Sequence, residues 1–254
     1  MAEKQQLTVA FFGATGGCVK ACLVLALQAG YHCTALARTP SKLHDLLLKN
    51  KVSESTIAEY LTITQGNVAD IDAVQQTLNA NGRPVDLIIS GIGGKPRFER
   101  SLKPTLDNPT VCQDATRAIL AAAQLSPRKP RLVVISTTGL SNKRDVPVMM
   151  MPLYHWLLKV PHEDKKVMED QIVAEMQKPE TERAIDNYLI VRPSLLVDGD
   201  GDGLPKLKTG SDTNPAIGYA ICRCDVGLWI FENAIRRASE SDGPFWGQMV
   251  SLTA

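Results

Sequence analysis

Apolar residues along the chain form short runs that alternate with stretches of helical spacing. Six runs rich in β-branched and apolar residues occur, at 7–12, 32–37, 60–64, 85–90, 131–136 and 188–192. Because several of them are nearly continuous, they indicate strands that are covered on both faces. The clearest helical patterns lie between these runs, at 17–29, 41–48, 71–79, 109–125 and 162–177. This alternation predicts an α/β fold with a doubly wound parallel sheet and right-handed crossovers.

The pattern changes after Pro193. A turn-rich stretch, DGDGDGLPK, is followed by a helical pattern at 225–238 and a last apolar run at 247–252. We see no internal repeat or low-complexity linker, and 254 residues are enough to build one substantial core. We therefore predict a single domain, 1–254, in which the part from about 194 to 254 contributes a small substrate cap.

The charge balance argues against two classes of partner. The chain has 28 lysines and arginines against 27 acidic residues, for a formal net charge of +1. Nucleic acids and anionic membranes are usually met by clustered basic residues, which this balance does not provide. The longest apolar stretch, 148–158, is about half of the roughly 20 residues that a membrane span needs. We interpret it as a lid, or as a surface that meets substrate or the second subunit of a homodimer.

The cysteines indicate a reducing compartment. Six of them are scattered over a chain that opens MAEKQQ, without the apolar core of a secretion signal, so reduced thiols in a cytoplasmic protein are expected. The pair Cys222 and Cys224 has neither the spacing nor the partner residues of a zinc site, which favours a packing role. No metal is predicted.

The stretch VAFFGATGGCVKAC, 9–22, passes from a strand through a turn of small residues into a helix. Glycines in such a turn let the backbone approach a pyrophosphate, and the first free N–H groups and the positive end of the helix dipole bind the anion. Gly13, Gly16 and Gly17 supply that turn. The alternative is a purely structural turn, but the place between first strand and first helix favours a Rossmann-type dinucleotide site.

The residues GATGGCV, 13–19, resemble the GATGxxG motif of the atypical short-chain dehydrogenases, which include NmrA-like, isoflavone-reductase-like and biliverdin-reductase-B-like proteins. The resemblance covers most of the chain, because the segments 35–43, 66–70, 86–94, 133–139 and 190–199 fall where this family places cofactor-contacting strand ends. It implies cofactor contacts from the first turn and from later strand ends: Thr15, Cys18, Asn67, Val68, Ser90, Gly91, Gly93, Pro193, Ser194 and Leu195. Asn67 and Val68 would flank the adenine.

One position departs from the family motif. Val19 replaces its third glycine, which in the general motif permits close packing of the helix on the strand. We expect the valine to hold the first helix slightly off the sheet without removing any N–H that binds phosphate.

The end of the second strand favours NADP(H). NAD-selective sites usually carry Asp or Glu there, to accept a hydrogen bond from the ribose 2′-OH. Arg38 occupies this place, and Lys42 stands one helical turn beyond it. A guanidinium can pair with a 2′-phosphate and stack on adenine, so NADP(H) is the expected cofactor. The alternative is a solvated arginine that opens a helix.

Classical members of the superfamily use a Tyr-xxx-Lys pair, which shares one helix face because of its i, i+4 spacing. The resemblance aligns the lysine with Lys165 and the tyrosine with Pro161, so the lysine is kept and its proton donor is lost. Lys165 lies on the same stripe as Met168 and Ile172, which predicts that it points toward the core. It would hold the cofactor ribose or orient the substrate. The alternative is a lysine whose stem packs on apolar surface while its charge stays in solvent.

Several neighbours are candidates for the remaining catalytic roles. If the alignment with the family shifts by one residue, Lys166 takes the role given to Lys165. The candidate proton donors are His162, His155 and Tyr154, of which imidazole suits neutral pH best. Three hydroxyl groups follow the fifth strand and would hold a substrate carbonyl or cap the next turn: Ser136, Thr137 and Thr138.

Two further segments are expected to shape the pocket. The loop 91–104 contains Lys95, Arg97 and Arg100, which would receive an acidic substrate or stay solvated. The segment 146–160 is rich in methionine and would form an apolar wall over the nicotinamide, or a subunit contact. RCDVG, 223–227, resembles the family's RxDVA segment and is expected to fix the cap by a salt bridge.

These patterns favour an NADPH-dependent reductase that acts on a carbonyl, imine or activated alkene of a small organic molecule, in specialised metabolism. A non-catalytic NADP(H)-binding sensor of the NmrA type is the first alternative, because the tyrosine is missing. A non-redox isomerase or cyclase on the same fold is the second. The fold cannot separate them, because function resides in the site.

Overall fold

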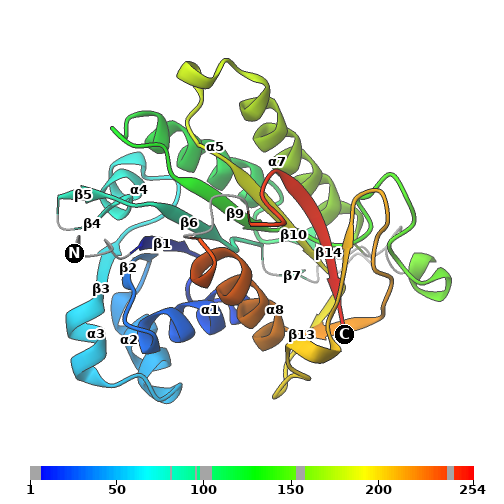
Figure 1. Ribbon diagram of the computed structural model, residues 1–254, viewed down its shortest axis with the longest axis horizontal. Coiled ribbons are helices and arrows are strands. Elements are labelled where there is room, and N and C mark those ends of the chain that lie inside the picture. Colours follow the sequence, from blue (N-terminus) through cyan, green and yellow to red (C-terminus); the bar gives the residue numbers. More distant parts are fainter. Residues whose placement is uncertain (1–6, 81, 95, 98–104, 153–157, 239–242) are drawn as a thin grey trace.

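The computed structural model describes residues 7–80, 82–94, 96–97, 105–152, 158–238 and 243–254. Its centre is an eight-stranded sheet of order β12-β14-β10-β9-β6-β1-β2-β3 (Figure 1). Its strands are β1 (Thr8–Phe12), β2 (His32–Ala37), β3 (Leu61–Gln65), β6 (Leu87–Ser90), β9 (Arg131–Ile135), β10 (Tyr188–Pro193), β12 (Lys208–Ser211) and β14 (Gln248–Thr253). Seven strands are parallel, and β12 runs antiparallel at the edge. The strand order reverses between β1 and β6, where open α/β sheets bind ligands at the carboxyl ends of their strands.

Helices cover both faces of the sheet (Figure 1). One face carries α1 (Gly17–Gln28), α2 (Pro40–Lys49), α3 (Glu54–Tyr60), α8 (Arg223–Ile230) and the π-helix η4 (Phe231–Arg236), and the other carries α4 (Ile71–Thr77), α5 (Val111–Gln124) and α7 (Lys159–Gln177). Strand β1 shows why its run is continuously apolar. Val9 and Phe11 pack into the first layer of core, and Ala10 and Phe12 pack into the second.

Short elements complete the described chain. They are β4 (Asn79–Ala80), β5 (Arg83–Pro84), β7 (Pro96–Arg97), β8 (Thr105–Leu106), β11 (Leu195–Val197), β13 (Ala220–Cys222) and the single turns η1 (Val148–Met150), η2 (Glu180–Glu182) and η3 (Leu204–Lys206). The pair β11–β13 forms a separate two-stranded sheet. In the described ranges, no helix is both long and apolar enough to cross a lipid bilayer.

The expected α/β fold is confirmed, and each of the predicted runs and helical patterns corresponds to a strand or helix. Helix α3 was not predicted, because only Ile57 of its seven residues is buried and no stripe reveals it. The C-terminal helix begins two residues before the predicted start and widens into a π-helix at Phe231. There the Asn233 side chain donates to the Trp229 carbonyl, a contact of the kind that interrupts the regular helical ladder.

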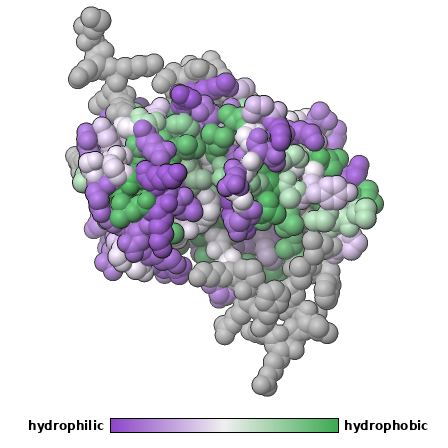
Figure 2. All heavy atoms as spheres, turned by 90° about the horizontal axis from the view of Figure 1, so that it is seen from below, coloured by the Kyte–Doolittle hydropathy of each residue, from purple (hydrophilic) through white to green (hydrophobic). Residues whose placement is uncertain are grey.

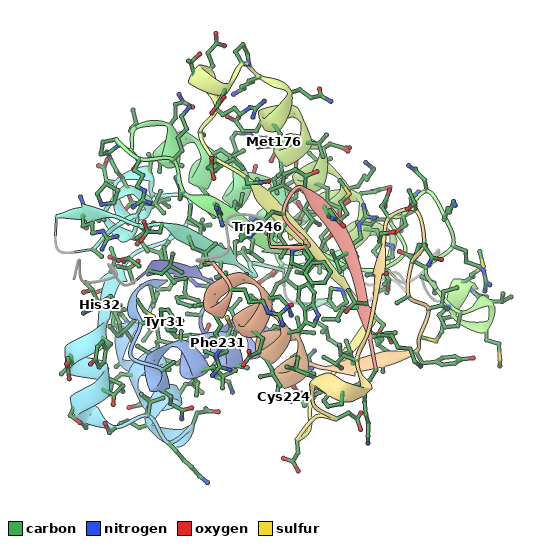
Figure 3. The ribbon with its side chains drawn as sticks, viewed as in Figure 1. Tyr31, His32, Met176, Cys224, Phe231 and Trp246 are labelled. Atoms are coloured by element: carbon green, nitrogen blue, oxygen red, sulfur yellow. The ribbon has the colours of Figure 1, made fainter. Side chains whose placement is uncertain are left out.

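The C-terminal part is built into the sheet as well as beyond it. Strand β14 pairs with β10, while α8 packs on α1 so closely that a Cβ on Gly227 would lie 2.6 Å from the Cβ of Ala21. The rings of Tyr31 and Phe231 meet edge to face with centroids 6.2 Å apart, on the face of the sheet that carries α1 and α8 (Figure 3). The strands β11 and β13 pair with each other outside this sheet, and whether their region covers a substrate stays a prediction.

Candidate functional site

The chain leaves β1 through a turn that only glycine fits. Gly13 has a φ of +79°, and a Cβ there would lie 2.9 Å from the carbonyl oxygen of Gly91. Gly16 donates its N–H to the Gly13 carbonyl at 2.8 Å. It occupies the N-cap position of α1, and since it has no side chain it cannot accept a hydrogen bond from the first N–H groups of the helix. Thr15 and Gly16 are exposed. The first N–H groups of α1 are therefore left for a ligand, and the positive end of the helix dipole favours an anion.

Val19 is accommodated by a glycine on the neighbouring strand end. Its side chain is buried over Gly91, where an added Cβ would lie 2.4 Å from Val19 Cγ2 and 3.1 Å from Ile135 Cδ1. The space that the family's third glycine provides is thus supplied from the other side of the contact. Whether α1 also sits farther from the sheet stays a prediction.

Arg223 lies across the start of α1. A Cβ on Gly17 would lie 2.5 Å from Arg223 Cδ, so the second helix-opening glycine makes room for this side chain. The Arg223 guanidinium pairs with Asp198 at 2.9 Å, which is a salt bridge from α8 to the turn-rich loop, as expected of the RCDVG segment. Asp225 acts differently, because its carboxylate accepts the backbone N–H groups of Asp202 and Gly203. Nothing in the sequence indicated that Arg223 reaches the glycine turn.

Two cations stand at the carboxyl end of β2. Arg38 follows the strand directly and is exposed, and Lys42 is exposed in the first turn of α2. Among the described residues, neither side chain has a carboxylate within ion-pair distance. The next strand end lies beside them, because Gly66 donates its N–H to the Ala37 carbonyl at 3.1 Å. Asn67, exposed, and Val68, half-buried, follow from there.

Lys165 reaches the carboxyl end of β9. Its ammonium donates to the Ile135 carbonyl at 2.7 Å, from a partly buried position on α7. Lys166 is exposed and forms an ion pair with Asp170 instead. The bond to the Ile135 carbonyl is the one hydrogen bond of the Lys165 ammonium among the described residues, so two of its three N–H donors have no partner there.

A buried carboxylate fixes the first turns of α7. Asp164 is 2 % exposed and accepts the N–H groups of Cys112 and Gln113 at 2.8 and 3.0 Å. These are free N–H groups at the start of α5, so Asp164 caps a helix that begins about fifty residues earlier. The contact locks α7 to α5 immediately beside Lys165. It was not predicted.

A second buried contact ties α7 to β10. Arg192 donates through Nε and Nη2 to the two oxygens of Glu169 at 2.9 and 2.7 Å, and Arg192 also contacts Ser141 and Asp212. Burial alone would lower the pKa of Arg192, but the hydrogen bonds and charge of Glu169, followed by those of Asp212, outweigh it and raise this pKa. Glu169 lies one turn beyond Lys165, so this bidentate pair and the Asp164 contact hold the helix on the two sides of the lysine.

Two thiols show how closely the elements converge. Burial raises the pKa of Cys18 to about 12, and the charges of Arg223 and Lys165 oppose that rise. Burial likewise raises the pKa of Cys112 to about 12, again opposed by Lys165. The starts of α1 and α5 therefore both lie within electrostatic reach of the Lys165 ammonium. Neither thiol is a thiolate at neutral pH.

The hydroxyl groups after β9 have different environments. Ser136 is 2 % exposed, and its Oγ has no hydrogen-bond partner among the described residues. Thr137 is half-buried, while Thr138 donates its Oγ1 hydrogen to the Pro193 carbonyl at 3.3 Å. Thr138 therefore ties the end of β9 to the end of β10, which differs from the predicted cap of the next turn. The role of Ser136 toward a ligand stays a prediction.

The remaining predicted residues are placed as follows. His162 is half-buried in the second turn of α7. Ser194 is engaged with Thr253 at 2.9 Å, and Leu195 is partly exposed. Ser90 is buried and Gly93 is exposed beyond β6. Four residues named in the sequence analysis lie outside the described residues: Lys95, Arg100, Tyr154 and His155.

All six cysteines are free thiols. Cys222 is buried and Cys224 is half-buried where β13 runs into α8 (Figure 3), and their sulfur atoms are 2.7 Å apart. Both contact the Gly199 carbonyl, so the pair packs against the turn-rich loop.

A family model described as NAD(P)H-binding matches residues 13–235, from the glycine turn to the end of the C-terminal helical region. The chain belongs to this family. The family assignment agrees with the expected atypical short-chain dehydrogenase group, and it confirms an NAD(P)H-type cofactor without deciding between NADH and NADPH.

Two curated relatives of this NAD(P)H-binding protein come from aspergilli. The chain is 52% identical to Reductase pytE of Aspergillus terreus over 259 residues, with 97% of both chains covered. It is 37% identical to Oxidase pynE of Aspergillus niger, covering 90% of this chain and 92% of the relative. The expectation of an oxidoreductase is confirmed by these relatives.

Solved structures share the fold at low sequence identity. The anaerobilin reductase ChuY of Escherichia coli O157:H7 has a TM-score of 0.62 at 18% identity, over 97% of this chain and 96% of that one. The yeast methylglyoxal/isovaleraldehyde reductase Gre2, solved with NADPH, has a TM-score of 0.63 at 13% identity, over 96% of this chain and 77% of that one. These likenesses confirm the Rossmann-type fold.

The glycine turn fits the cofactor that the family implies. Backbone must approach a pyrophosphate closely, and both Gly13 and Gly17 stand where any Cβ would collide with a neighbour. The uncapped N–H groups of α1 are the donors that a pyrophosphate needs.

Proposed function

We propose that this protein is an NADPH-dependent reductase of a small organic molecule in specialised metabolism, acting on a carbonyl, an imine or an activated alkene. The observation that carries the proposal is the placement of Lys165, whose ammonium donates to the Ile135 carbonyl at the carboxyl end of β9 and has no second hydrogen-bond partner within the described ranges. The relationship to Reductase pytE over nearly the whole chain supports the reductive direction.

The choice of NADPH rests on the two cations after β2. A 2′-phosphate would lie between Arg38 and Lys42, with the guanidinium free to form two parallel hydrogen bonds. No acidic residue stands at this strand end to accept a ribose 2′-OH. Asn67 and Val68 would line the adenine on the neighbouring strand end.

The chain's own groups have three tasks in the reaction. NADPH, when bound, supplies the hydride. Lys165 donates to the nicotinamide ribose or to the substrate and fixes its orientation, while Asp164 and Glu169 hold the helix that carries it. The Ser136 hydroxyl donates to the substrate oxygen and stabilises the negative charge that develops on it. His162 or water delivers the proton, because Pro161 occupies the tyrosine position.

The proline at that position also favours a second function. A protein that keeps the cofactor cradle but lacks the tyrosine could serve as an NADP(H) sensor that turns nothing over. Such a protein would bind NADP+ and NADPH with little preference.

Calorimetric titration with NADPH, NADP+ and NADH separates these functions. For the reductase we expect NADPH to bind most tightly. The substitution Arg38→Ala should lower the affinity for NADPH by about tenfold to a hundredfold and leave the affinity for NADH nearly unchanged. Lys49→Ala, an exposed lysine at the far end of α2, is the matched control. A screen for NADPH oxidation with ketones, imines and enones follows. Equal binding of both redox forms without turnover would support the sensor, and absence of any binding would contradict both.

A further inference from the structure

A hollow of about 550 Å³ opens beyond the carboxyl ends of β10 and β14. It lies between the segment that follows β9 and the C-terminal strands. The residues that matter for its chemistry are Arg144, Pro147, Val148, Lys208, Ile217 and Tyr219. Its volume is in the range of small-molecule sites.

The hollow and the Lys165 ammonium both lie at the carboxyl-end edge of the sheet. Ile135, Val191 and Val250 lie level with one another in neighbouring strands, and Ala254, which lines the hollow, is four residues past Val250. Four residues of strand span about 13 Å, and two strand spacings span about 10 Å. The hollow is therefore on the order of 15 Å from the Ile135 carbonyl that Lys165 holds, within reach of the far end of an elongated substrate.

Two cations of this hollow have no acidic partner among the described residues. Arg144 and Lys208 are both exposed. The acids close to them are engaged elsewhere: Asp145 accepts from Gly139 and Ser141, and Asp212 pairs with Arg192. Even with a carboxylate counted at Ala254, the lining carries more positive than negative charge.

Apolar side chains are exposed around the same hollow. Val148 is 63%, Ile217 39% and Tyr219 57% exposed, and the neighbouring Met149 is 84% exposed. The view from below shows hydrophobic residues mixed among hydrophilic ones toward the right-hand end of the molecule (Figure 2). Large apolar side chains that stay exposed together next to unpaired cations mark a binding site for an amphipathic molecule.

We propose that this hollow binds the acidic end of an elongated apolar substrate, with Arg144 and Lys208 as its specificity-determining residues. The proposal rests on the reductase function. The apolar body lies against Val148, Ile217 and Tyr219, the carboxylate or a similar anionic group pairs with the two cations, and the reducible group extends toward Lys165. A neutral analogue leaves both cations unpaired and binds more weakly.

A matched pair of fluorescent probes tests this inference without knowledge of the substrate. 8-Anilinonaphthalene-1-sulfonate carries an anionic group on an apolar body, and N-phenyl-1-naphthylamine is the same body without the charge. Both are titrated, in the presence of NADPH, into the wild type and into Arg144→Gln/Lys208→Gln. The control is Lys206→Gln, an exposed lysine that pairs with Asp202 outside the hollow. We expect the double variant to lose about tenfold to a hundredfold in affinity for the sulfonate and little for the amine.

The outcomes separate this inference from the proposed function. Unchanged sulfonate affinity in the double variant, or equal losses for both probes, would overturn the acidic-end assignment. NADPH affinity, measured on the same samples, reports whether the variants are folded and whether the reductase proposal stands. If NADPH does not bind while the sulfonate discrimination holds, the reductase proposal fails and the anion pocket remains. If NADPH binds and turnover is found without discrimination between the probes, only the pocket assignment fails.

Discussion

At the residue scale, the difference between two adjacent lysines is decided by helix geometry. Neighbouring helical residues point about 100° apart, so Lys165 and Lys166 cannot face the sheet together. The apolar stripe in the sequence predicted that Lys165 points inward, and the structure agrees: its ammonium reaches Ile135, while Lys166 pairs with Asp170 at the surface.

Removal of the Lys165 ammonium tests its orienting role. We expect Lys165→Met to lower kcat/KM by about 10²- to 10⁴-fold, because the group that aligns the reactants is lost. Lys166→Met should leave kcat/KM within about twofold, because it removes only an exposed ion pair. Steady-state kinetics with a substrate from the NADPH-oxidation screen makes the comparison. Equal effects of the two substitutions would contradict the assignment.

Val19 and Gly91 form a complementary pair that a double-mutant cycle can detect. Gly91→Ala places a Cβ 2.4 Å from Val19 Cγ2, so we expect a loss of about 1–3 kcal/mol in the free energy of unfolding. Val19→Ala removes the obstructing methyl groups, and the double variant should lose less than the two single losses combined. Urea denaturation measures all four proteins. Strict additivity would show that the two residues do not share this space.

At the element scale, α7 is held by charged contacts on two sides. Asp164 caps the start of α5, and Glu169 pairs with Arg192 of β10. Both carboxylates are buried, so each interaction is made in a medium where an unpaired charge would be costly. The position of Lys165 thus depends on a helix that cannot slide along the sheet without breaking one of these contacts.

Removal of one partner of the buried pair Glu169–Arg192 should destabilise the protein more than replacement of both. Glu169→Ala leaves Arg192 buried with only part of its partners, and we expect a loss of about 3–5 kcal/mol in the free energy of unfolding. Replacement of both residues by methionine should cost less than the single change, because no fully buried charge is left behind and Asp212, the other acidic partner of Arg192, is 37% exposed. Asp170→Ala, which breaks an exposed pair on the same helix, should cost at most about 1 kcal/mol. Chemical denaturation at neutral pH compares the three.

Elements could be predicted from the sequence, whereas most contacts of the site could not. Continuous apolar runs are a strong signal for strands buried on both faces, and all six predicted strands exist. The cofactor turn could be predicted because the residues that form it are neighbours in the sequence.

The contact between Asp164 and Cys112 could not, since the two residues are 52 positions apart in the chain. Their contact depends on how α5 and α7 pack, which residue spacing within one helix does not encode.

At the scale of the whole molecule, the core holds ionisable thiols. Cys18, Cys22, Cys33 and Cys112 are buried, and burial raises the pKa of each above its ordinary value. The unfolded chain releases these protons at lower pH than the folded one. The contribution of these thiols to the free energy of unfolding is therefore fully present below about pH 9 and is lost as the pH rises toward their folded-state pKa values.

The alkaline sensitivity can be assigned to single thiols. Cys112 has a folded-state pKa of about 12 against an ordinary value of 9.0, so it should contribute a slope of up to roughly 1.4 kcal/mol per pH unit above pH 9. We expect Cys112→Ala to lose less stability than the wild type between pH 7.5 and pH 10.5 in urea denaturation. Parallel curves for the two proteins would show that this thiol does not titrate differently on unfolding.

The contact of Arg223 with Gly17 links the first turn of the chain to the start of α8. Any anion that binds at the turn lowers the free energy of the folded state by an amount that grows with its concentration. Because the Arg223 side chain lies against Gly17, we expect α8 to be stabilised as well. Amide protons of α8 should therefore exchange more slowly with deuterium when NADPH is present, and this protection should be smaller in Arg223→Ala, where only the packing of α8 on α1 is left. Occupancy of the cofactor site would then be detectable near the opposite end of the sequence, as a change in how often α8 opens.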